Sequence, residues 1–364
     1  MNTVIRPARR LAVVALVMMT SALASIVTSG VARADTRTLD LLVHAPSDAS
    51  ATVLTVDGTT WTAGARTSGT GEPVTGSEHF RIGSITKTFV ATVILQLVDE
   101  HRIELDAPIE TYLPGVVRDG DRITVRQILQ HTSGIPDYMK TPGWSTNRWR
   151  GDDRFRDFRP QQLLEQAFTR PPDFAPGAKF RYSNSNYIVA GLLIEAVAGR
   201  PYGTEIDRRI LRPLHLAGTS FPGSNPRLPE PAIHAVADVD GRRVEVTEQN
   251  ETLDWAAGEM ISTQADLATF FGALLGGRLL SPESLAEMRR TVPMGSGFHY
   301  GLGLERFDLP CGGQVWGHGG QLLGYVTYAY RRDDGRTFTL LEVSGSDDGF
   351  LRFAAMSTAA YCPR

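Results

Sequence analysis

The sequence predicts a mixed α/β (α+β) fold, in which helices flank one antiparallel sheet and a mostly helical subdomain is inserted. Extended segments occur near both ends of the chain, whereas helical patterns dominate roughly residues 105–290. Strands at both ends with helices between them indicate one sheet that both ends of the chain build together. A chain of 364 residues is also long enough to bury a large core.

The first 34 residues have the pattern of a secretory signal peptide. Three arginines, Arg6, Arg9 and Arg10, precede an uncharged and mostly apolar run over 11–27, and Ala32-Arg33-Ala34 has the form of a cleavage site. Serines and threonines interrupt the run and no stop-transfer charges follow it, which disfavours a membrane anchor. We expect secretion after cleavage near Ala34, leaving residues 35–364 as the working domain.

Composition excludes several classes of partner. Residues 1–34 carry four arginines and no acid, so the remaining chain has 33 basic and 40 acidic residues and a net charge of −7. No basic patch stands out, which argues against a nucleic-acid partner. The eight histidines show neither H-x-x-x-H spacing nor pairing with cysteines, so we expect no metal. We also expect no cofactor, no stable membrane anchor and a monomer.

The elements before residue 100 are predicted to be two strands and a helix. Strands over 51–56 and 60–63 flank Asp57-Gly58, which is a hairpin signal. A helix from about Ser84 to Asp99 is apolar over so much of its circumference that it should be buried.

The middle of the chain carries helix boundary signals. Thr124 and Gln127 fit a capping box, a helix over about 186–197 ends at Gly199, and Thr263 caps another helix. Residues 218–250 are rich in Pro, Gly and Asp, and we expect irregular loops there.

The C-terminal part returns to extended segments. They are separated by turn signals that include Asp334-Gly335, and a final helix is expected over about 351–361. The extended segments cover residues 300–305, 315–318, 324–330 and 337–343.

Only two cysteines are present, Cys311 and Cys362. In an oxidising compartment they favour a disulfide that would stabilise the fold by about 4 kcal/mol, whereas two buried thiols are the alternative.

Ser84 and Lys87 form an S-x-x-K motif on the predicted buried helix. Positions i and i+3 share one helix face, so the hydroxyl and the amine can meet. A serine at a helix N-terminus also lies where free N–H groups favour negative charge, which suits a nucleophile. The chain has only three lysines, and a lysine buried on an apolar helix requires a reason.

Two further motifs follow along the chain. Tyr182-Ser183-Asn184 offers a phenol that can relay a proton and an amide that can bind lysine and substrate. His318-Gly319-Gly320 lies on a predicted strand, where glycines allow close backbone approach. The next N–H, that of Gln321, can pair with that of Ser84 to bind an oxyanion.

These three motifs, in this order, resemble those of the serine β-lactamase and penicillin-binding superfamily. Within it the chain is most similar to the secreted, soluble DD-carboxypeptidases, which are related to class C β-lactamases, D-aminopeptidases and family VIII esterases. The similarity covers nearly all of residues 35–364. It rests on the three motifs and on the segments His131-Thr-Ser-Gly134, Pro176-Gly177, Ala257-Gly258 and Trp316-Gly317.

The resemblance implies a role for each motif residue. Ser84 is the acylated nucleophile, Lys87 activates it, and Tyr182 acts as general acid or base. Asn184 orients Lys87 and the substrate, and His318 takes the place of the third-motif lysine or histidine. The resemblance also implies that Cys311 pairs with Cys362. Substrate-binding candidates are Gly319, Gly320, Gln321, Glu305 and Trp255.

The chain departs from the carboxypeptidase pattern where a substrate carboxylate would bind. Gly319 and Gln321 stand where hydroxyl residues are found in the carboxypeptidases resembled, and Glu305 stands where they have an arginine. Arg306 follows, but adjacent strand residues face opposite ways. An acid there repels a carboxylate and attracts an ammonium, so esters, amides or substrates with a free D-amino terminus are candidates.

We therefore expect a secreted serine hydrolase that acts through an acyl-enzyme on Ser84. The substrate is a small peptide, ester or amide, such as a peptidoglycan stem peptide, and β-lactams are candidate acylating ligands. The leading candidate is a D-Ala-D-Ala carboxypeptidase-like peptidase. The alternatives are an esterase, amidase or D-aminopeptidase, a β-lactamase, and a non-catalytic cell-wall or β-lactam sensor. A Ser-His-Asp hydrolase is disfavoured because Ile82 replaces the first glycine of G-x-S-x-G.

Overall fold

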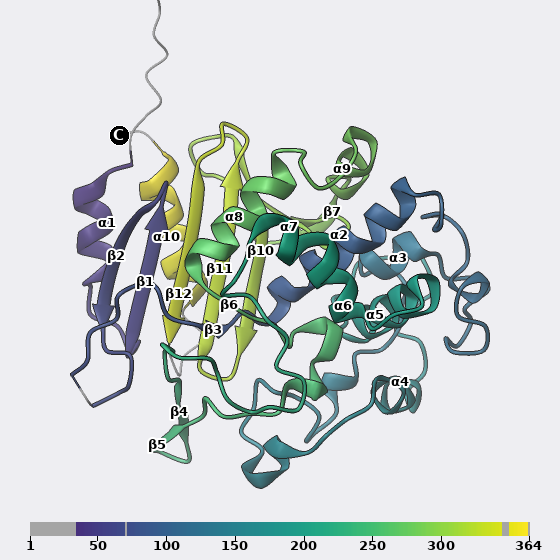
Figure 1. Cartoon of the computed structure of the whole chain (residues 1–364), viewed down its shortest axis with the longest axis horizontal. Coiled ribbons are helices and arrows are strands. Elements are labelled where there is room, and N and C mark those ends of the chain that lie inside the picture. The colour runs from purple at the N-terminus through teal and green to yellow at the C-terminus, as the bar shows by residue number, and fades with distance from the viewer. Residues whose placement is uncertain (1–33, 70, 344–348, 363–364) are drawn as a thin grey trace, which may run out of the picture. The chain divides into compact units, whose positions relative to one another are not determined.

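A computed structural model describes residues 34–69, 71–343 and 349–362 (Figure 1). It contains an eight-stranded antiparallel sheet in the order β2-β1-β12-β11-β10-β9-β8-β7, which confirms the predicted fold class. The strands are β1 (Ala51–Val56), β2 (Thr59–Gly64), β7 (Val292–Gly295), β8 (Phe298–Tyr300), β9 (Glu305–Asp308), β10 (Gln314–Leu322), β11 (Tyr325–Arg332) and β12 (Thr337–Val343).

Both ends of the described chain meet in this sheet. β1 lies between β2 and β12, with Ala51 opposite Val343 and Val56 opposite Phe338. The β1–β2 hairpin turns at Asp57-Gly58, where both residues have positive φ, as a tight hairpin turn requires. The predicted pairing of N-terminal and C-terminal strands is thus confirmed.

Helices cover both faces of the sheet and create two apolar layers. α8 (Gln264–Leu275) packs on β11 and β12, as Figure 1 shows. α1 (Thr36–Val43) and α10 (Gly349–Tyr361) pack against each other on the opposite side, over a cluster that includes Leu54, Phe338 and Phe353.

α2 (Thr86–Asp99) runs through the larger apolar cluster, as its sequence predicted. A 3₁₀ turn, η1 (Gly83–Ile85), leads into it, and nearly every side chain from Thr86 to Leu97 is buried. Its neighbours include α5 (Ser185–Ala198), α6 (Tyr202–Ile206) and α9 (Pro282–Met288). The helix that carries the S-x-x-K motif is therefore a fixed central element.

The remaining elements lie mostly between α2 and β7. α3 (Val125–Leu129) begins at the Thr124 capping box and α5 ends at left-handed Gly199, both as predicted. Further helices and short strands are α4 (Pro160–Phe168), α7 (Arg212–Leu214), β3 (Phe80–Arg81) with β6 (Ile261–Ser262), and β4 (Val236–Val239) with β5 (Arg242–Glu245). Single turns are η2 (Ile109–Thr111), η3 (Tyr138–Lys140), η4 (Gly151–Phe155), η5 (Asp207–Leu211), η6 (Glu251–Leu253) and η7 (Trp255–Ala257).

Three local predictions differ from the structure. The first element is α1 rather than a strand; Asp35 caps it by accepting the Thr38 N–H. The Pro- and Gly-rich region over 218–250 contains the β4–β5 hairpin, which turns at Asp240-Gly241. The extended segment predicted over 300–305 is broken, because residues 301–304 separate β8 from β9. The predicted signal peptide, residues 1–34, lies outside the described residues except for Ala34.

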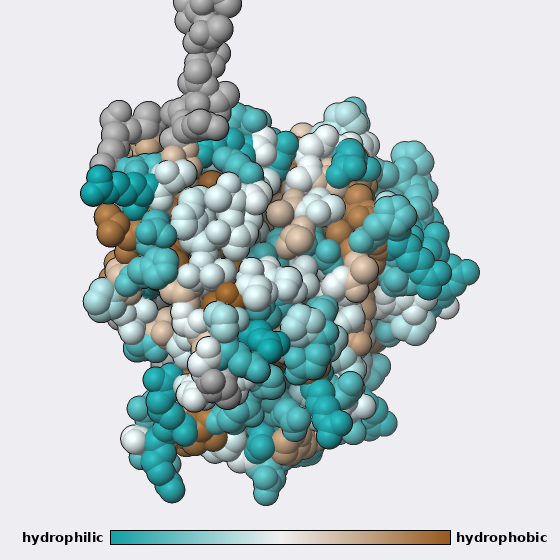
Figure 2. Space-filling view, turned by 60° about the vertical axis from the view of Figure 1, so that its left-hand side comes forward, coloured by the Kyte–Doolittle hydropathy of each residue, from teal (hydrophilic) through white to brown (hydrophobic). Residues whose placement is uncertain are grey.

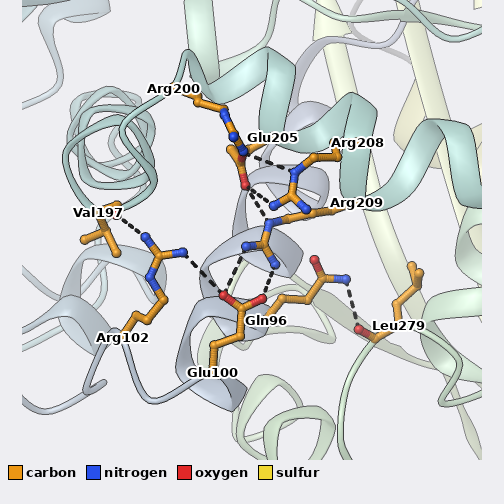
Figure 3. Close-up of polar contacts among 9 residues, drawn as sticks. All are labelled: Gln96, Glu100, Arg102, Val197, Arg200, Glu205, Arg208, Arg209 and Leu279. Carbon is orange, nitrogen blue, oxygen red and sulfur yellow. Dashed lines mark hydrogen bonds and ion pairs between the residues drawn. The ribbon is translucent and has the colours of Figure 1, made fainter.

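An ion-pair cluster ties α6 and η5 to the end of α2 (Figure 3). The side chain of Glu205, only 1% exposed, accepts hydrogen bonds from Arg208 at 2.8 Å and Arg209 at 2.7 Å. The guanidinium of Arg209 also reaches Glu100 at 2.5 Å. One arginine thus bridges two carboxylates from different elements.

A disulfide joins Cys311, in the β9–β10 loop, to Cys362 after α10, with the Cα atoms 5.7 Å apart. Of the two alternatives that the sequence left open, the structure has the bond. It fixes the C-terminal helix to the β9–β10 hairpin.

The face visible in Figure 2 is mostly hydrophilic, with apolar residues in small separate patches. Within the described residues, no helix combines the length and the apolar character that crossing a bilayer requires. The large apolar side chains that remain exposed in that part of the chain are Leu41, Val116, Phe155, Met294 and Leu351.

Candidate active site

The three sequence motifs meet in one cleft with a volume of about 420 Å³. It lies where η1 and the start of α5 face strand β10, so segments far apart in sequence form its walls. The cleft is lined by Ser84, Met139, Asn147, Tyr182, Asn184, Asp254, Met294, Phe298, Glu305, His318, Gly319, Gly320, Gln321, Val326, Tyr328 and Phe350.

Ser84 lies in η1, immediately before α2, and is partly exposed to the cleft. Gly83 has φ of +50°, and a side chain there would come within 2.9 Å of the Gln321 backbone nitrogen. The glycine therefore lets the nucleophile segment pack directly on β10. This close approach brings the backbone of Ser84 next to that of Gln321, as an oxyanion site made from their two N–H groups requires.

Lys87 is fully buried beneath Ser84, as the apolar helix predicted. Its Nζ lies 2.9 Å from Ser84 Oγ, 2.8 Å from Asn184 Oδ1 and 2.6 Å from the carbonyl oxygen of Ala257. Burial lowers the pKa of Lys87 to about 7, although the charges of Asp254, Asp137 and Glu305 oppose this shift.

These contacts fix the direction of proton transfer when Lys87 is neutral. Asn184 Oδ1 and the Ala257 carbonyl only accept hydrogen bonds, so they take the two N–H groups of a neutral amine. The remaining lone pair then points to Ser84, whose hydroxyl donates to it. A pKa near 7 leaves about half of the enzyme in this form at neutral pH.

Tyr182 lies on the other side of the nucleophile. Burial raises the pKa of its phenol well above the usual value, and a hydrogen bond with Ser84 acts in the opposite direction. Lys87 Nζ is 5.0 Å from the centre of its ring. Tyr182 is therefore protonated in the resting site, and this favours a role as proton donor to the leaving group over that of first base.

His131 packs against this tyrosine. The sequence pattern singled out the segment His131-Thr-Ser-Gly134 but predicted no role for the histidine. Its ring centre is 4.2 Å from that of Tyr182. Its Nδ1 accepts hydrogen bonds from the Ser183 N–H at 3.3 Å and the Asn186 amide at 3.1 Å. Burial lowers the pKa of His131 well below its usual value, so this ring remains neutral.

Asn184 connects Lys87 to a residue that the sequence reasoning missed. Its Oδ1 accepts from Lys87, and its Nδ2 donates to Asp137 Oδ2 at 3.2 Å. Asp137 therefore fixes the orientation of the amide, with the oxygen toward the lysine. The Pro136-Asp137-Tyr138 segment carries no recognisable motif, which explains the omission.

His318 is buried on β10 and is neutral. Burial lowers its pKa, although Glu305 opposes the shift. Its Nδ1 donates to the Gly319 carbonyl at 2.5 Å, and its Nε2 accepts from the Tyr300 hydroxyl at 2.9 Å. Both ring nitrogens are thus occupied, so His318 shapes the cleft wall and is not arranged as a proton carrier.

Glu305, at the start of β9, lies in the cleft with only 6% of its surface exposed. Its Oε2 accepts from the Gly319 N–H at 2.9 Å and from the Tyr330 hydroxyl. Its Oε1 is 3.9 Å from His318 Nδ1 and has no hydrogen-bond partner among the described residues. Arg306 faces away, as the strand alternation predicted, and pairs with Asp308.

Trp255 lies outside the lining of the cleft, and its assignment to substrate binding stays a prediction. Its ring packs against that of Tyr202 at 4.7 Å and lies over Gly191 of α5. The preceding residue, Asp254, lines the cleft instead. The other proposed substrate-binding residues, Gly319, Gly320 and Gln321, do lie in the cleft wall.

The arrangement can perform acyl transfer. Lys87 takes the Ser84 proton, the hydroxyl oxygen attacks a carbonyl, and the adjacent backbone N–H groups stabilise the oxyanion. Within the described residues, no three His, Cys, Asp or Glu side chains are placed to hold a metal ion. A buried lysine and a tyrosine around one nucleophilic serine define a serine hydrolase.

Comparisons with known proteins place this hydrolase in a family. The family model described as Beta-lactamase matches residues 39–355, so the chain belongs to the beta-lactamase family. Penicillin-binding protein 4 of Amycolatopsis lactamdurans is 27% identical over 313 residues, which are 78% of this chain and 77% of that protein. Two Bacillus subtilis penicillin-binding relatives are matched over only 52% and 62% of their own length.

Solved structures show the same architecture. A D-stereospecific amidohydrolase from Streptomyces sp. has a TM-score of 0.80 and 38% identity, covering 90% of this chain and 97% of that one. The D-amino acid amidase from Ochrobactrum anthropi SV3, solved with L-phenylalanine amide, has a TM-score of 0.77 and 26% identity, covering 89% and 97%.

Proposed function

We propose that the protein is an amidohydrolase that acts on D-amino acid amides and related D-aminoacyl substrates with a free α-ammonium group. The observation that carries the proposal is the carboxylate of Glu305, which lies in the cleft of Ser84 with one oxygen unoccupied. A substrate ammonium can donate to this oxygen in a largely buried setting, where a charged hydrogen bond is strong.

The charge of the whole cleft supports this assignment. Asp254 and Glu305 line it, whereas no lysine or arginine does so among the described residues, and Lys87 is covered by Ser84 and Asn184. A substrate carboxylate beside Glu305 would meet like charge without a partner, which costs affinity. An ammonium meets opposite charge.

Part of the cleft lining is apolar. Met294, Phe298, Val326, Tyr328 and Phe350 line the cleft together with Glu305. Such a surface buries an aromatic or aliphatic side chain of the substrate. A hydrophobic D-amino acid amide combines the ammonium and the side chain that this cleft suits. The preference for the D-form rests on the likeness to the D-stereospecific amidohydrolase and the D-amino acid amidase.

The test is kcat/KM for three substrates: D-phenylalanine amide, its L-enantiomer and N-acetyl-D-phenylalanine amide. We expect the free D-amide to be better than the acetylated one by about 30-fold or more, which corresponds to about 2 kcal/mol for a buried charged contact. Ser84→Ala serves as the blank. An acetylated substrate that is hydrolysed as well as the free amide contradicts the proposal.

Glu305→Gln sharpens this test. The glutamine oxygen can still accept from the Gly319 N–H and the Tyr330 hydroxyl, so the local structure is kept while the charge is removed. In this variant, kcat/KM for the free D-amide should be within about threefold of kcat/KM for the acetylated amide. The value for the acetylated amide itself should change little. A variant that keeps the full preference would show that another group binds the ammonium.

A second candidate is a D-Ala-D-Ala carboxypeptidase-like peptidase, and one observation favours it. The cleft continues, through Met139, Asn147 and Asn184, into a second hollow that Lys140 and Arg148 line. These exposed cations can attract the C-terminal carboxylate of a peptide. A D-Ala-D-Ala peptide hydrolysed faster than its C-terminal amide, with the advantage lost in a Lys140→Gln/Arg148→Gln variant, would favour this candidate.

A β-lactamase and a β-lactam sensor remain alternatives that one kinetic trace separates. A sensor gives a burst of acylation without steady turnover, whereas a β-lactamase turns over continuously. Both Lys87 and Tyr182 are in place for deacylation, and this supports turnover.

A further inference from the structure

A separate cavity, here called the distal cavity, has a volume of about 280 Å³ and shares no lining residue with the catalytic cleft. Its size is close to the lower limit of small-molecule pockets, which is about 300 Å³. Protein interiors are otherwise close-packed, so an opening of this size is a candidate binding site. It is lined by Arg118, Asp119, Arg122, Ile123, Ser133, Gly134, Ile135, Pro136, Phe168, Pro172, Phe174, Ala175 and Pro176.

Part of this lining belongs to sequence motifs for which the catalytic site gives no use. Ser133 and Gly134 end the segment His131-Thr-Ser-Gly134, and Pro176 begins the segment Pro176-Gly177. Neither Ser133, Gly134 nor Pro176 lines the catalytic cleft. The distal cavity therefore gives these residues a common location.

Backbone contacts hold the two segments against each other. Gly134 has φ of +83°, and a side chain there would come within 2.2 Å of the Phe174 carbonyl oxygen. The Gly134 carbonyl accepts from the Asp173 N–H at 2.9 Å, and the Thr132 carbonyl accepts from the Gly177 N–H at 2.8 Å. The walls of the distal cavity are thus fixed by the main chain, as a preformed binding site requires.

Most of the cavity wall is apolar. The hydroxyl of Ser133 lines it, but this group already donates to Asn186 at 2.6 Å and accepts from the Ile135 N–H at 3.1 Å. An apolar ligand body is the complement of such a wall, because its burial removes apolar surface from water. The apolar lining residues are Ile123, Ile135, Pro136, Phe168, Pro172, Phe174, Ala175 and Pro176.

The charged lining residues are exposed, and two of the three are arginines. Arg118 is held in place, because its guanidinium donates to the carbonyls of Phe168 and of Arg170, the latter at 3.0 Å, and lies 5.5 Å from the centre of the Phe168 ring. These bonds leave three of its five N–H groups. The side chain of Arg122 has no hydrogen bond or ion pair among the described residues. With Asp119, the lining carries two positive charges and one negative, a net charge of +1.

The distal cavity and the catalytic cleft therefore differ in charge. Among the described residues, the charged groups that line the cleft are the acids Asp254 and Glu305. At the distal cavity, Lys179 adds a further cation, because its Nζ is 5.4 Å from the ring of the lining residue Phe174. A carboxylate that the cleft repels is attracted here.

We propose that the distal cavity is a second binding site, which takes a small carboxylic acid with an apolar body. The carboxylate pairs with Arg118 and Arg122, and a planar guanidinium can bind it through two parallel hydrogen bonds. The hydrocarbon part is buried against Ile123, Ile135 and Phe174. This site does not depend on the amide substrate proposed for the cleft.

A ligand in this site contacts the loop that supports the catalytic residues from behind. Pro136 lines the cavity, and its carbonyl accepts from the Ser185 hydroxyl at 2.6 Å. The next residue, Asp137, accepts from the Asn184 amide at 3.2 Å. The proposed site is thus one residue away from the side chain that orients Asn184 toward Lys87.

The probe for the test is 3-phenylpropionate, titrated by calorimetry at neutral pH and low salt. It has a carboxylate and an aromatic ring, but it has neither an ammonium for Glu305 nor a scissile bond. We expect saturable binding with a Kd on the order of 1 mM or below. The neutral alcohol 3-phenyl-1-propanol is the matched ligand and should bind at least about fivefold more weakly, because it cannot form a charged hydrogen bond with an arginine.

Two double variants that remove the same charge locate the site. Arg118→Gln/Arg122→Gln should weaken binding of the acid by about fivefold or more, whereas Lys140→Gln/Arg148→Gln, in the second hollow beside the cleft, should leave Kd within about twofold. Thermal melts establish that each variant is folded. If the first variant does not fold, Arg122→Gln decides alone with a loss of about threefold, since the side chain of Arg122 supports no other described residue.

Four results would overturn the proposal. Binding of the acid is not saturable up to about 10 mM, or the alcohol binds as tightly as the acid. The variant at Lys140 and Arg148 loses binding while the variant at Arg118 and Arg122 keeps it. The acid competes with a p-nitrophenyl ester with an inhibition constant equal to its Kd, which places it in the catalytic cleft. Failure of the D-amide preference changes none of these outcomes.

Discussion

Lys87 and its surroundings show what the sequence reveals about a single residue and what it leaves out. A lysine on a helix that is apolar nearly all round has to be buried, and burial lowers its pKa. Both points follow from the sequence pattern. The carboxylates that oppose the shift, Asp137, Asp254 and Glu305, come from three separate segments, and only the last was foreseen. Single acidic residues in loops carry no periodic signal.

Tyr182→Phe isolates one proton transfer. We expect kcat to fall by roughly 10²–10⁴, the usual contribution of a general acid–base group, while the fold is kept, because the ring that packs on His131 remains. Steady-state kinetics on a reactive ester and on an amide check this, with Ser84→Ala as the blank. The loss should be larger for the amide, whose leaving group needs a proton. If kcat falls only slightly and by the same factor on both substrates, Tyr182 does not transfer a proton in the reaction.

Among the secondary-structure elements, the contact between β10 and η1 determines the site. A side chain added at Gly320 would come within 2.0 Å of the Ile82 carbonyl, so strand and nucleophile turn have to move apart. Gly320→Ala should destabilise the protein by about 1–3 kcal/mol and reduce kcat/KM at least tenfold.

Gly272→Ala is the matched control for this substitution. Gly272 lies in α8 with nothing within 4 Å of the added methyl group. Alanine there should stabilise the protein by about 0.5–1 kcal/mol with kcat/KM unchanged. Urea unfolding and ester hydrolysis measure both variants. A Gly320→Ala protein with wild-type stability and activity would show that the contact is not tight.

The ion-pair cluster at the end of α2 gives a pH-dependent contribution to stability. Although burial raises the pKa of Glu205, hydrogen bonds from Arg208 and Arg209 bring it down to about 2. The unfolded value is about 4.3. A depressed folded-state pKa means that the stabilisation is complete above about pH 4.3 and is lost as the pH falls toward 2.

Glu205→Gln should therefore cost about 2 kcal/mol at pH 7 and much less at pH 3, as measured by urea unfolding at each pH. Glu287→Gln, whose carboxylate is 30% exposed and pairs with Arg126 and Arg290, is the control and should cost less than about 1 kcal/mol. A cost for Glu205→Gln that is the same at both pH values would contradict the assignment.

Elements with strong local signals were predicted well, and those that depend on tertiary contacts were not. The β1–β2 hairpin, the capping box at Thr124 and the glycine stop at Gly199 each have a short-range cause. α1 was missed because its pattern is short. The Trp255 ring packs against that of Tyr202 outside the cleft lining, and this tertiary contact has no short-range signal in the sequence.

For the whole molecule, the disulfide constrains the C-terminal helix. Replacing both Cys311 and Cys362 with alanine should lower the free energy of unfolding by about 4 kcal/mol, because the bond closes a loop between residues 51 positions apart. Urea unfolding measures the difference, with reduced wild-type protein as the comparison. Ester hydrolysis at 25 °C should be retained. A double variant as stable as the oxidised wild type would contradict this prediction.

The pairing of β1 with β12 also sets an order of events during synthesis. Ser50 bonds to Val343, 293 positions later, so one side of β1 has no partner until the last strand has been made. Such distant contacts make folding slow. The nucleophile is translated early, but the wall that binds its oxyanion belongs to β10, which β11 and β12 connect to the rest of the sheet. Hydrolytic activity therefore appears only when nearly the entire chain is present, and a nascent fragment that already contains Ser84, Lys87 and Tyr182 is inert.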